Sequence, residues 1–303
     1  MDGRVDGRGD ASVSGWSEVL ITLTHEQLKK VLAKALLVRR FEERVYEEVK
    51  RGGVKIPVYL SAGQEMTAAT LSVIYESMGV KPHIFIQHRG HSTYLSFGGC
   101  PKALAHELMG LADGCAGGMG GSASIQSFDS QIYGHDGLMG SHVPIAVGFA
   151  YETKQPTICF VGDAAGEEDY SLTAIGWAST KNLPILFVVE DNNLSILTEK
   201  LVRRNWEISD VAEAMKLPHV RHFPDSSPSE IAQNFPATLS SPALLNICTT
   251  RKFWHAGAGT DQPNYDEIDP LLRLLNQIVP IETEAWLHEQ ESIITQILAE
   301  AWN

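Results

Sequence analysis

The chain has 303 residues, of which 44% are hydrophobic and 20% are charged, and its formal net charge at pH 7 is −13. This composition is typical of a globular protein and excludes a chain that is disordered throughout. The acidic balance argues against non-specific binding to nucleic acid or to a membrane surface, because both need a basic face.

Residues 1–20 lack the apolar core of a secretory signal, and we predict a flexible tail there, followed by one domain over residues 21–303. No apolar run reaches the ~18 residues of a membrane span. The cysteines lie far apart without a CxxC pair, which is typical of reduced thiols in a cytoplasmic protein; they are Cys100, Cys115, Cys159 and Cys248.

A long helix is the first element predicted. Thr24 and Gln27 have the spacing of a capping box, an apolar stripe with helical period follows, and Gly52 and Gly53 end it. A second helix is predicted over 64–78 and a third from Pro101, where the fixed φ of proline suits the first helical position. The pattern is helical again from about residue 265 to the C-terminus.

Three apolar runs are predicted to be buried strands: residues 157–161, 184–189 and 243–248. Nearly continuous apolar runs mark strands that are covered on both faces. A segment of helical length lies between the first two, over 169–180, so these elements form a βαβ unit. The fold class is therefore α/β, a three-layer sandwich with a mostly parallel sheet and helices on both faces.

Polar residues follow two of these strands. Asp163 comes after the first and Asn192 after the second, at strand ends that we expect to be neighbours. Carboxylate, amide and carbonyl oxygens suit Mg²⁺, and the small residues Gly162, Ala164 and Ala165 would let a diphosphate approach the backbone. The alternative interpretation is an acidic loop and an asparagine-rich turn on a solvated surface.

Five segments together resemble one enzyme family. GD, a helix, NLP, an apolar strand and EDNN are similar to the thiamine-diphosphate motif, which is usually written GDG followed by NN. The other segments resemble the alpha subunit of heteromeric 2-oxo acid dehydrogenases of the pyruvate, branched-chain and acetoin types; they are residues 36–65, 88–95, 114–122 and 134–150. The glycine run GGMGG within 114–122 follows no strand, so it is not a dinucleotide-binding loop. The resemblance implies the thiamine-diphosphate-binding fold over the domain, with helices at its C-terminal end.

The resemblance also implies a set of site residues. Mg²⁺ would be held by Asp163, Asn192 and the backbone carbonyl of Leu194. Ala164 stands where the family has glycine, and His88 stands where it has an aromatic residue. The residues implied to contact the cofactor are His88, Arg89, Gly137, Met139, Gly162, Asp163, Ala164, Ala165, Asn192, Leu194, Ile196 and His255.

Two histidines are candidate catalytic groups. His255 follows Arg251 by four residues, as in the family's loop where a histidine faces the reacting carbon, and His91 is the second candidate. A histidine pKa near 6.5 suits proton transfer.

The resemblance implies half of an active site. The missing half is a beta subunit that supplies a glutamate to the aminopyrimidine ring, in an α₂β₂ assembly that decarboxylates a small 2-oxo acid and passes the product to a lipoyl acyltransferase. One alternative is a split-subunit transketolase-like or acyloin-forming enzyme, in which a carbon compound is the acceptor. Another alternative is a subunit that kept the fold and only supports assembly.

Overall fold

The computed structural model describes residues 21–257, 259–260, 265–278 and 283–303. The tail predicted over residues 1–20 lies outside the described residues. A six-stranded parallel sheet runs through the centre in the order β2-β1-β3-β4-β8-β7. Its strands are β1 (His83–Phe85), β2 (Ile132–Tyr133), β3 (Thr157–Gly162), β4 (Ile185–Asp191), β7 (His219–Phe223) and β8 (Ala243–Cys248).

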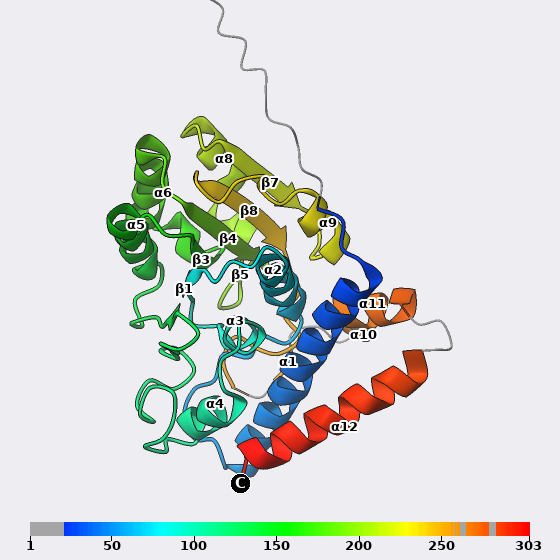
Figure 1. The fold of residues 1–303 in the computed structure, drawn as a ribbon. Helices are drawn as coiled ribbons and strands as arrows, with labels where there is room; N and C mark the ends of the chain where they lie inside the picture. Colours follow the sequence, from blue (N-terminus) through cyan, green and yellow to red (C-terminus); the bar gives the residue numbers. More distant parts are fainter. Residues whose placement is uncertain (1–20, 258, 261–264, 279–282) are drawn as a thin grey trace, which may run out of the picture.

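Helices cover both faces of this sheet (Figure 1). One face carries α5 (His142–Thr153), α6 (Asp169–Lys181) and α8 (Ile208–Ala214). The other carries α1 (His25–Arg51), α2 (Glu65–Ser77), α3 (His91–Ser96), α4 (Pro101–Leu108) and α9 (Pro228–Gln233). The remaining elements are β5 (Leu194–Ser195), β6 (Thr198–Glu199), α7 (Lys200–Arg203), α10 (Tyr265–Ile268), α11 (Pro270–Ile278), α12 (Thr283–Ala301) and a 3₁₀ turn at Ala165–Glu167.

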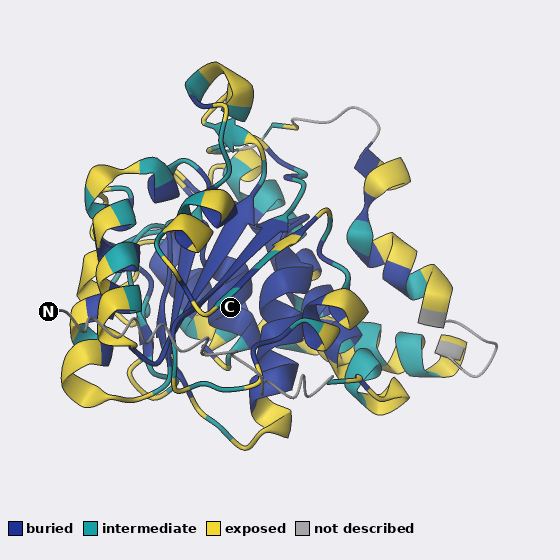
Figure 2. Cartoon of the chain, turned by 90° about the horizontal axis from the view of Figure 1, so that it is seen from above, coloured by how far each residue is buried: buried dark blue, intermediate teal, exposed yellow. Residues whose placement is uncertain are grey.

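The alternation of side chains along the strands builds two cores. Ile158 and Phe160 of β3 pack on the side of α1 and α2, whereas Cys159 and Val161 pack on the side of α5 and α6. Viewed from above, the strands are buried at the centre and the exposed residues lie on the outer helices (Figure 2). This arrangement confirms the predicted three-layer α/β sandwich.

Local signals set the first helix. Thr24 caps α1, because its side chain accepts from the Gln27 backbone N–H at 3.2 Å while the Gln27 side chain accepts from the Thr24 N–H at 2.8 Å. Gly52 ends the helix with a φ of 77°, a left-handed conformation that glycine adopts without steric cost. α12 then lies alongside α1 at the C-terminal end of the chain (Figure 1).

A buried ion-pair network ties α1 to α2 and to the chain before α11. Arg39 donates to Glu65 at 2.6 Å and to Asp269 at 2.5 Å, and all three side chains are almost fully buried. Removal of one partner would leave a charge buried without compensation.

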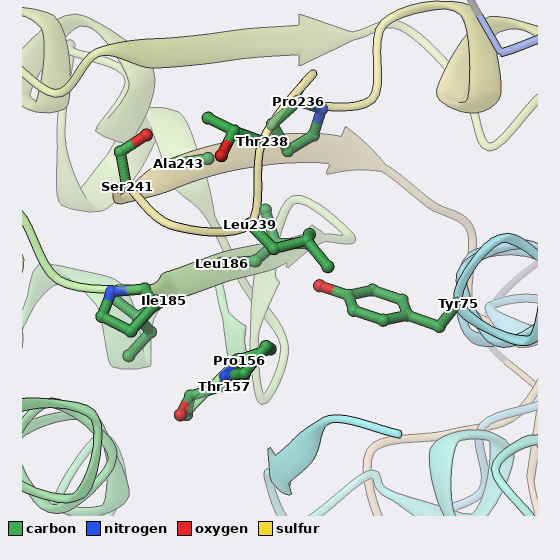
Figure 3. A pocket seen from close by; sticks show the side chains of 11 residues that line it. Tyr75, Pro156, Thr157, Ile185, Leu186, Pro236, Thr238, Leu239, Ser241 and Ala243 are labelled. Carbon is green, nitrogen blue, oxygen red and sulfur yellow. The ribbon is translucent and has the colours of Figure 1, made fainter. Parts of the chain in front are cut away.

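A very small cavity lies at the amino ends of β3, β4 and β8. Tyr75 reaches from α2 with its hydroxyl directed toward Leu239 and Leu186 (Figure 3). The cavity left between them is about 10 Å³, at the lower limit for one water molecule. Among the described helices, none combines the length and the apolar character needed to cross a bilayer.

Candidate functional site

A cavity of about 500 Å³ opens at the carboxyl ends of β3 and β4. This is the edge where open parallel sheets bind their ligands. Its walls come from the segments that follow β1, β2, β3, β4 and β8. Eleven of the predicted site residues line it: His88, Arg89, Met139, Gly162, Asp163, Ala164, Ala165, Asn192, Leu194, Ile196 and His255.

Asp163 is the first residue after β3 and is 2% exposed. Its Oδ2 accepts from Arg203 Nη2 at 2.5 Å. Burial, together with the nearby charge of Asp191, raises the pKa of Asp163 to about 6, although Arg203 acts in the opposite direction. The carboxylate is therefore costly to keep charged here unless a cation accompanies it.

Asn192 is held in place by two hydrogen bonds. Its Nδ2 donates to Gln64 Oε1 at 3.2 Å, and its Oδ1 accepts from the Leu194 backbone N–H at 3.1 Å. Asn193 lies between Asn192 and Leu194 in the chain and has a φ of 64°, a left-handed conformation that asparagine tolerates. The chain turns at this residue and enters β5. Asp163, Asn192 and Leu194 thus line one cavity. A carboxylate, an amide oxygen and a main-chain carbonyl are a donor set that suits Mg²⁺.

Gly162, the last residue of β3, and Ala164 differ in how much a larger side chain would disturb. A Cβ on Gly162 would lie 2.9 Å from Gln87 Oε1, so a larger residue would displace that side chain. Ala164 has φ −73° and ψ −37°, an ordinary right-handed conformation. The alanine that replaces the family's glycine therefore causes no backbone strain.

Arg89 joins two sides of the cavity. It is 3% exposed, and it donates to the Leu60 carbonyl at 2.8 Å and to the His255 carbonyl at 3.2 Å. Its Nη2 also lies 3.3 Å from His255 Nδ1. A ring nitrogen that accepts from a guanidinium leaves the ring hydrogen on the other nitrogen, so we assign it to Nε2 of His255.

His88 lies beside His255, with 5.7 Å between the ring centroids, and edge-on to Tyr59 at 4.9 Å. Burial, then the charge of Arg89, holds the pKa of His88 well below its usual range. Its Nε2 is buried and has no hydrogen-bond partner within the described chain. His88 is therefore neutral near pH 7, and its side chain forms part of the cavity wall.

Two predicted residues do not line the cavity. His91 is fully buried, with its Nδ1 3.1 Å from Glu42 Oε2 and its Nε2 2.6 Å from Ser122 Oγ. The catalytic contact predicted for His91 finds no support in this placement, because both ring nitrogens are engaged in the interior. Gly137 donates its N–H to His135 Nδ1 at 2.8 Å, and its φ of 97° suits glycine.

The glycine-rich segment wraps an internal carboxylate. The N–H groups of Ala116 and Gly118 donate to one oxygen of Glu107, and those of Gly120 and Gly121 donate to the other, at 2.7 to 2.9 Å. These amides are already engaged by Glu107, which agrees with the conclusion that this run is not a dinucleotide-binding loop.

Several residues that line the cavity or contact its walls were not predicted as site residues. Gln64 and Arg203 contact the predicted metal ligands, and Arg251 donates to the Ile196 carbonyl at 3.0 Å. Gln87 donates to Glu190 at 2.6 Å, and burial raises the pKa of Glu190 to about 7. The basic run KLVRR at 200–204, so close to the acidic strand ends, was the one sequence signal that could have indicated Arg203.

Residues 33–222 match the family described as "Dehydrogenase E1 component". The chain belongs to that family. The alpha subunit of pyruvate dehydrogenase E1 from Rickettsia felis is 28% identical over 300 residues, which cover 92% of this chain and 90% of the relative. The alpha subunit of acetoin:2,6-dichlorophenolindophenol oxidoreductase from Cupriavidus necator is 31% identical over 185 residues, which cover 59% of this chain and 55% of the relative.

Solved transketolases share the fold of this E1 family member. A transketolase from Pichia stipitis superposes with a TM-score of 0.55 at 15% identity, over 92% of this chain and 46% of the transketolase. The chain therefore spans less than half of the transketolase, and the likeness concerns the fold alone. The predicted membership in the thiamine-diphosphate-dependent 2-oxo acid dehydrogenase alpha subunits is confirmed by the family match and the relatives.

Proposed function

We propose that this chain binds the diphosphate end of thiamine diphosphate through Mg²⁺ and forms half of a decarboxylating active site that a beta subunit completes. The observation that supports this most is the meeting of Asp163 and Asn192 in one cavity, from the ends of two neighbouring strands. Arg89 and His255 line the same cavity from two further segments.

Each residue then has a role set by its position. Asp163, Asn192 and the Leu194 carbonyl would hold Mg²⁺, and the backbone at Gly162 would lie along the diphosphate. Thiamine diphosphate supplies, when bound, the electron sink that decarboxylation needs. His255, with its hydrogen on Nε2 and its Nδ1 facing Arg89, would donate that hydrogen to developing negative charge on the substrate.

The positions of the carboxylates that line the cavity support a beta subunit as the partner. Among the residues that the structure describes, the carboxylates lining the cavity all follow β3: Asp163, Glu167 and Glu168. They lie on the side assigned to Mg²⁺ and diphosphate, so we assign the glutamate for the aminopyrimidine ring to a beta subunit. The relatives are named as alpha subunits, which supports an α₂β₂ assembly.

The relatives leave two substrate classes open. They are named for pyruvate dehydrogenase and for an acetoin oxidoreductase, so we propose a small 2-oxo acid or an acyloin as substrate. A lipoyl acyltransferase is the proposed acceptor. A carbon acceptor, as in a transketolase-like reaction, is the alternative, and the identity of the acceptor distinguishes the two.

The test is a calorimetric titration of thiamine diphosphate with Mg²⁺ into the chain co-purified with its beta subunit. Asp163→Ala should abolish binding, whereas Glu152→Ala, at an exposed position of α5, should leave it unchanged. No binding to the unaltered complex would instead favour a subunit that only supports assembly. Enzymatic decarboxylation by the chain alone would refute the shared site.

A further inference from the structure

The short helix α7 and the residue after it, Arg204, place three cations on the acidic edge of the sheet. Lys200 lies 2.7 Å from Asp191 and 2.8 Å from Glu207, and Arg203 pairs with Asp163. The apolar side chains of the helix bury little surface, because Leu201 and Val202 are 79% and 77% exposed. Ion pairs therefore hold α7 more than apolar packing does.

Arg203 occupies an oxygen that the proposed function assigns to a metal. Its Nη2 lies 2.5 Å from Asp163 Oδ2, while its Nη1 pairs with Glu167. Its Nε is buried without a hydrogen-bond partner in the described chain. The guanidinium therefore bonds through its two Nη atoms, one to each of these two carboxylates. The side chain itself lines the cavity.

We propose that Arg203 is a built-in counter-cation that competes with Mg²⁺ for Asp163 and thereby sets the metal affinity of the site. This inference rests on the proposed function, in which Asp163 is a metal ligand. Two cations at one buried carboxylate repel strongly, since water does not screen them there. Glu167 already holds the other arm of Arg203, so the arginine keeps one ion pair when it leaves Asp163.

A neighbouring arginine provides a matched control. Arg204 has the same charge and lies one residue further along, but its ion pairs run to Glu167 at 3.2 Å, to Glu207 at 3.9 Å and to Asp191 at 4.0 Å. Its guanidinium also stacks on Trp206, 4.8 Å from the ring centroid. Substitution of Arg204 lowers the local positive charge by the same amount without vacating Asp163 Oδ2.

The experiment is a calorimetric titration of MgCl₂ into the complex of this chain and its beta subunit, with thiamine diphosphate at a fixed concentration and no substrate. Arg203→Gln should tighten Mg²⁺ binding by about tenfold or more, because it removes a like charge from the metal ligand. Arg203→Lys, which keeps a cation but loses the planar fork, should tighten it less. Arg204→Gln should change it by less than about threefold, because Arg204 pairs with other carboxylates and does not occupy Asp163 Oδ2.

Unchanged or weaker Mg²⁺ binding in Arg203→Gln would overturn the inference, and so would equal tightening in Arg204→Gln. Asp163→Ala separates this failure from failure of the proposed function. If Asp163→Ala abolishes binding while Arg203→Gln does not tighten it, only the competition is wrong. If Asp163→Ala binds Mg²⁺ as well as the unaltered chain does, the proposed metal site is wrong and the competition with it.

Discussion

His142 makes the stability of this fold sensitive to acid. It is the first residue of α5 and is 2% exposed, and its Nε2 donates to the Phe160 carbonyl of β3 at 2.7 Å. Burial lowers the pKa of His142 to about 4, although the hydrogen bond to Phe160 opposes the shift. The folded-state pKa is below the unfolded value near 6.5, so the stabilisation is complete above that value and is lost as the pH falls toward 4.

The magnitude follows from the two pKa values. Between about pH 7.5 and pH 5 the unfolded chain takes up most of one proton at this histidine, whereas the folded chain takes up little. The linkage relation gives a loss of about 2 kcal/mol in the free energy of unfolding over that interval. His142→Gln removes the titrating ring and keeps an N–H donor for Phe160, so its stability should fall by about 2 kcal/mol less over the same interval.

Urea denaturation of the full chain at both pH values, followed by tryptophan fluorescence and circular dichroism, measures this difference. The matched control is His25→Gln at an exposed position of α1, which removes a histidine without opening the interior. If the unaltered chain and His142→Gln lose the same stability between the two pH values, burial of a neutral His142 is not the source of acid sensitivity.

Three further substitutions test other parts of the fold and site. Glu107→Gln should lower the free energy of unfolding, measured by urea denaturation, by about 3 kcal/mol or more, because an N–H₂ group would face backbone N–H donors inside the glycine-rich loop. A smaller loss would show that the loop keeps its conformation without the carboxylate. Ile196 is a β-branched residue with a φ of 54°, a strained conformation that asparagine tolerates better. Ile196→Asn should therefore relieve about 1 kcal/mol of strain and raise the melting temperature, and it should weaken cofactor binding in calorimetry because Ile196 lines the cavity. A lower melting temperature would contradict this. Arg39→Met should lower the free energy of unfolding by about 3–5 kcal/mol, because it leaves two buried carboxylates unpaired. Arg40→Met, at a half-exposed position of the same helix, should lower it by less than about 1 kcal/mol. Equal losses in the two variants would refute the argument from burial.

Local chemistry made much of the fold predictable. The capping box and the glycine pair place both ends of α1 within a residue of those predicted, and the apolar runs at 157–161, 184–189 and 243–248 are β3, β4 and β8. These signals lie within the segments themselves. The short crossover through α6 also makes β3 and β4 neighbours, as the predicted βαβ unit requires.

The strands that the sequence analysis did not find are short or polar. β1 and β2 have three and two residues, too few for any apolar period, and they exist because β3 offers an edge for β1 and β1 offers one for β2. β7 (His219–Phe223) lies at the other edge, and three of its five residues are polar. Pairing with a neighbour, and not propensity, forms such strands.

The site was predictable where it depends on strand ends and not where it depends on distant contacts. Asp163 and Asn192 follow strands, so topology alone brings them to one edge. Gln64 meets Asn192 across 128 positions of the chain, and no local pattern could indicate that contact. His91 matched a family segment, yet every residue of α3 is buried, and its ring turns to Glu42 in place of the cavity.

The charges around Asp163 bear on how a cofactor would enter. Within five residues, the segment 200–204 sets Lys200, Arg203 and Arg204 against the carboxylates that end β3 and β4. Three cations of the chain thus already pair with four carboxylates at this edge, and Mg²⁺ alone would add positive charge beside a displaced guanidinium. A diphosphate brings the negative charge that both cations then need. We therefore expect the metal and the diphosphate to bind together, each weakly without the other, because the site is balanced either with Arg203 on Asp163 or with both ligands present.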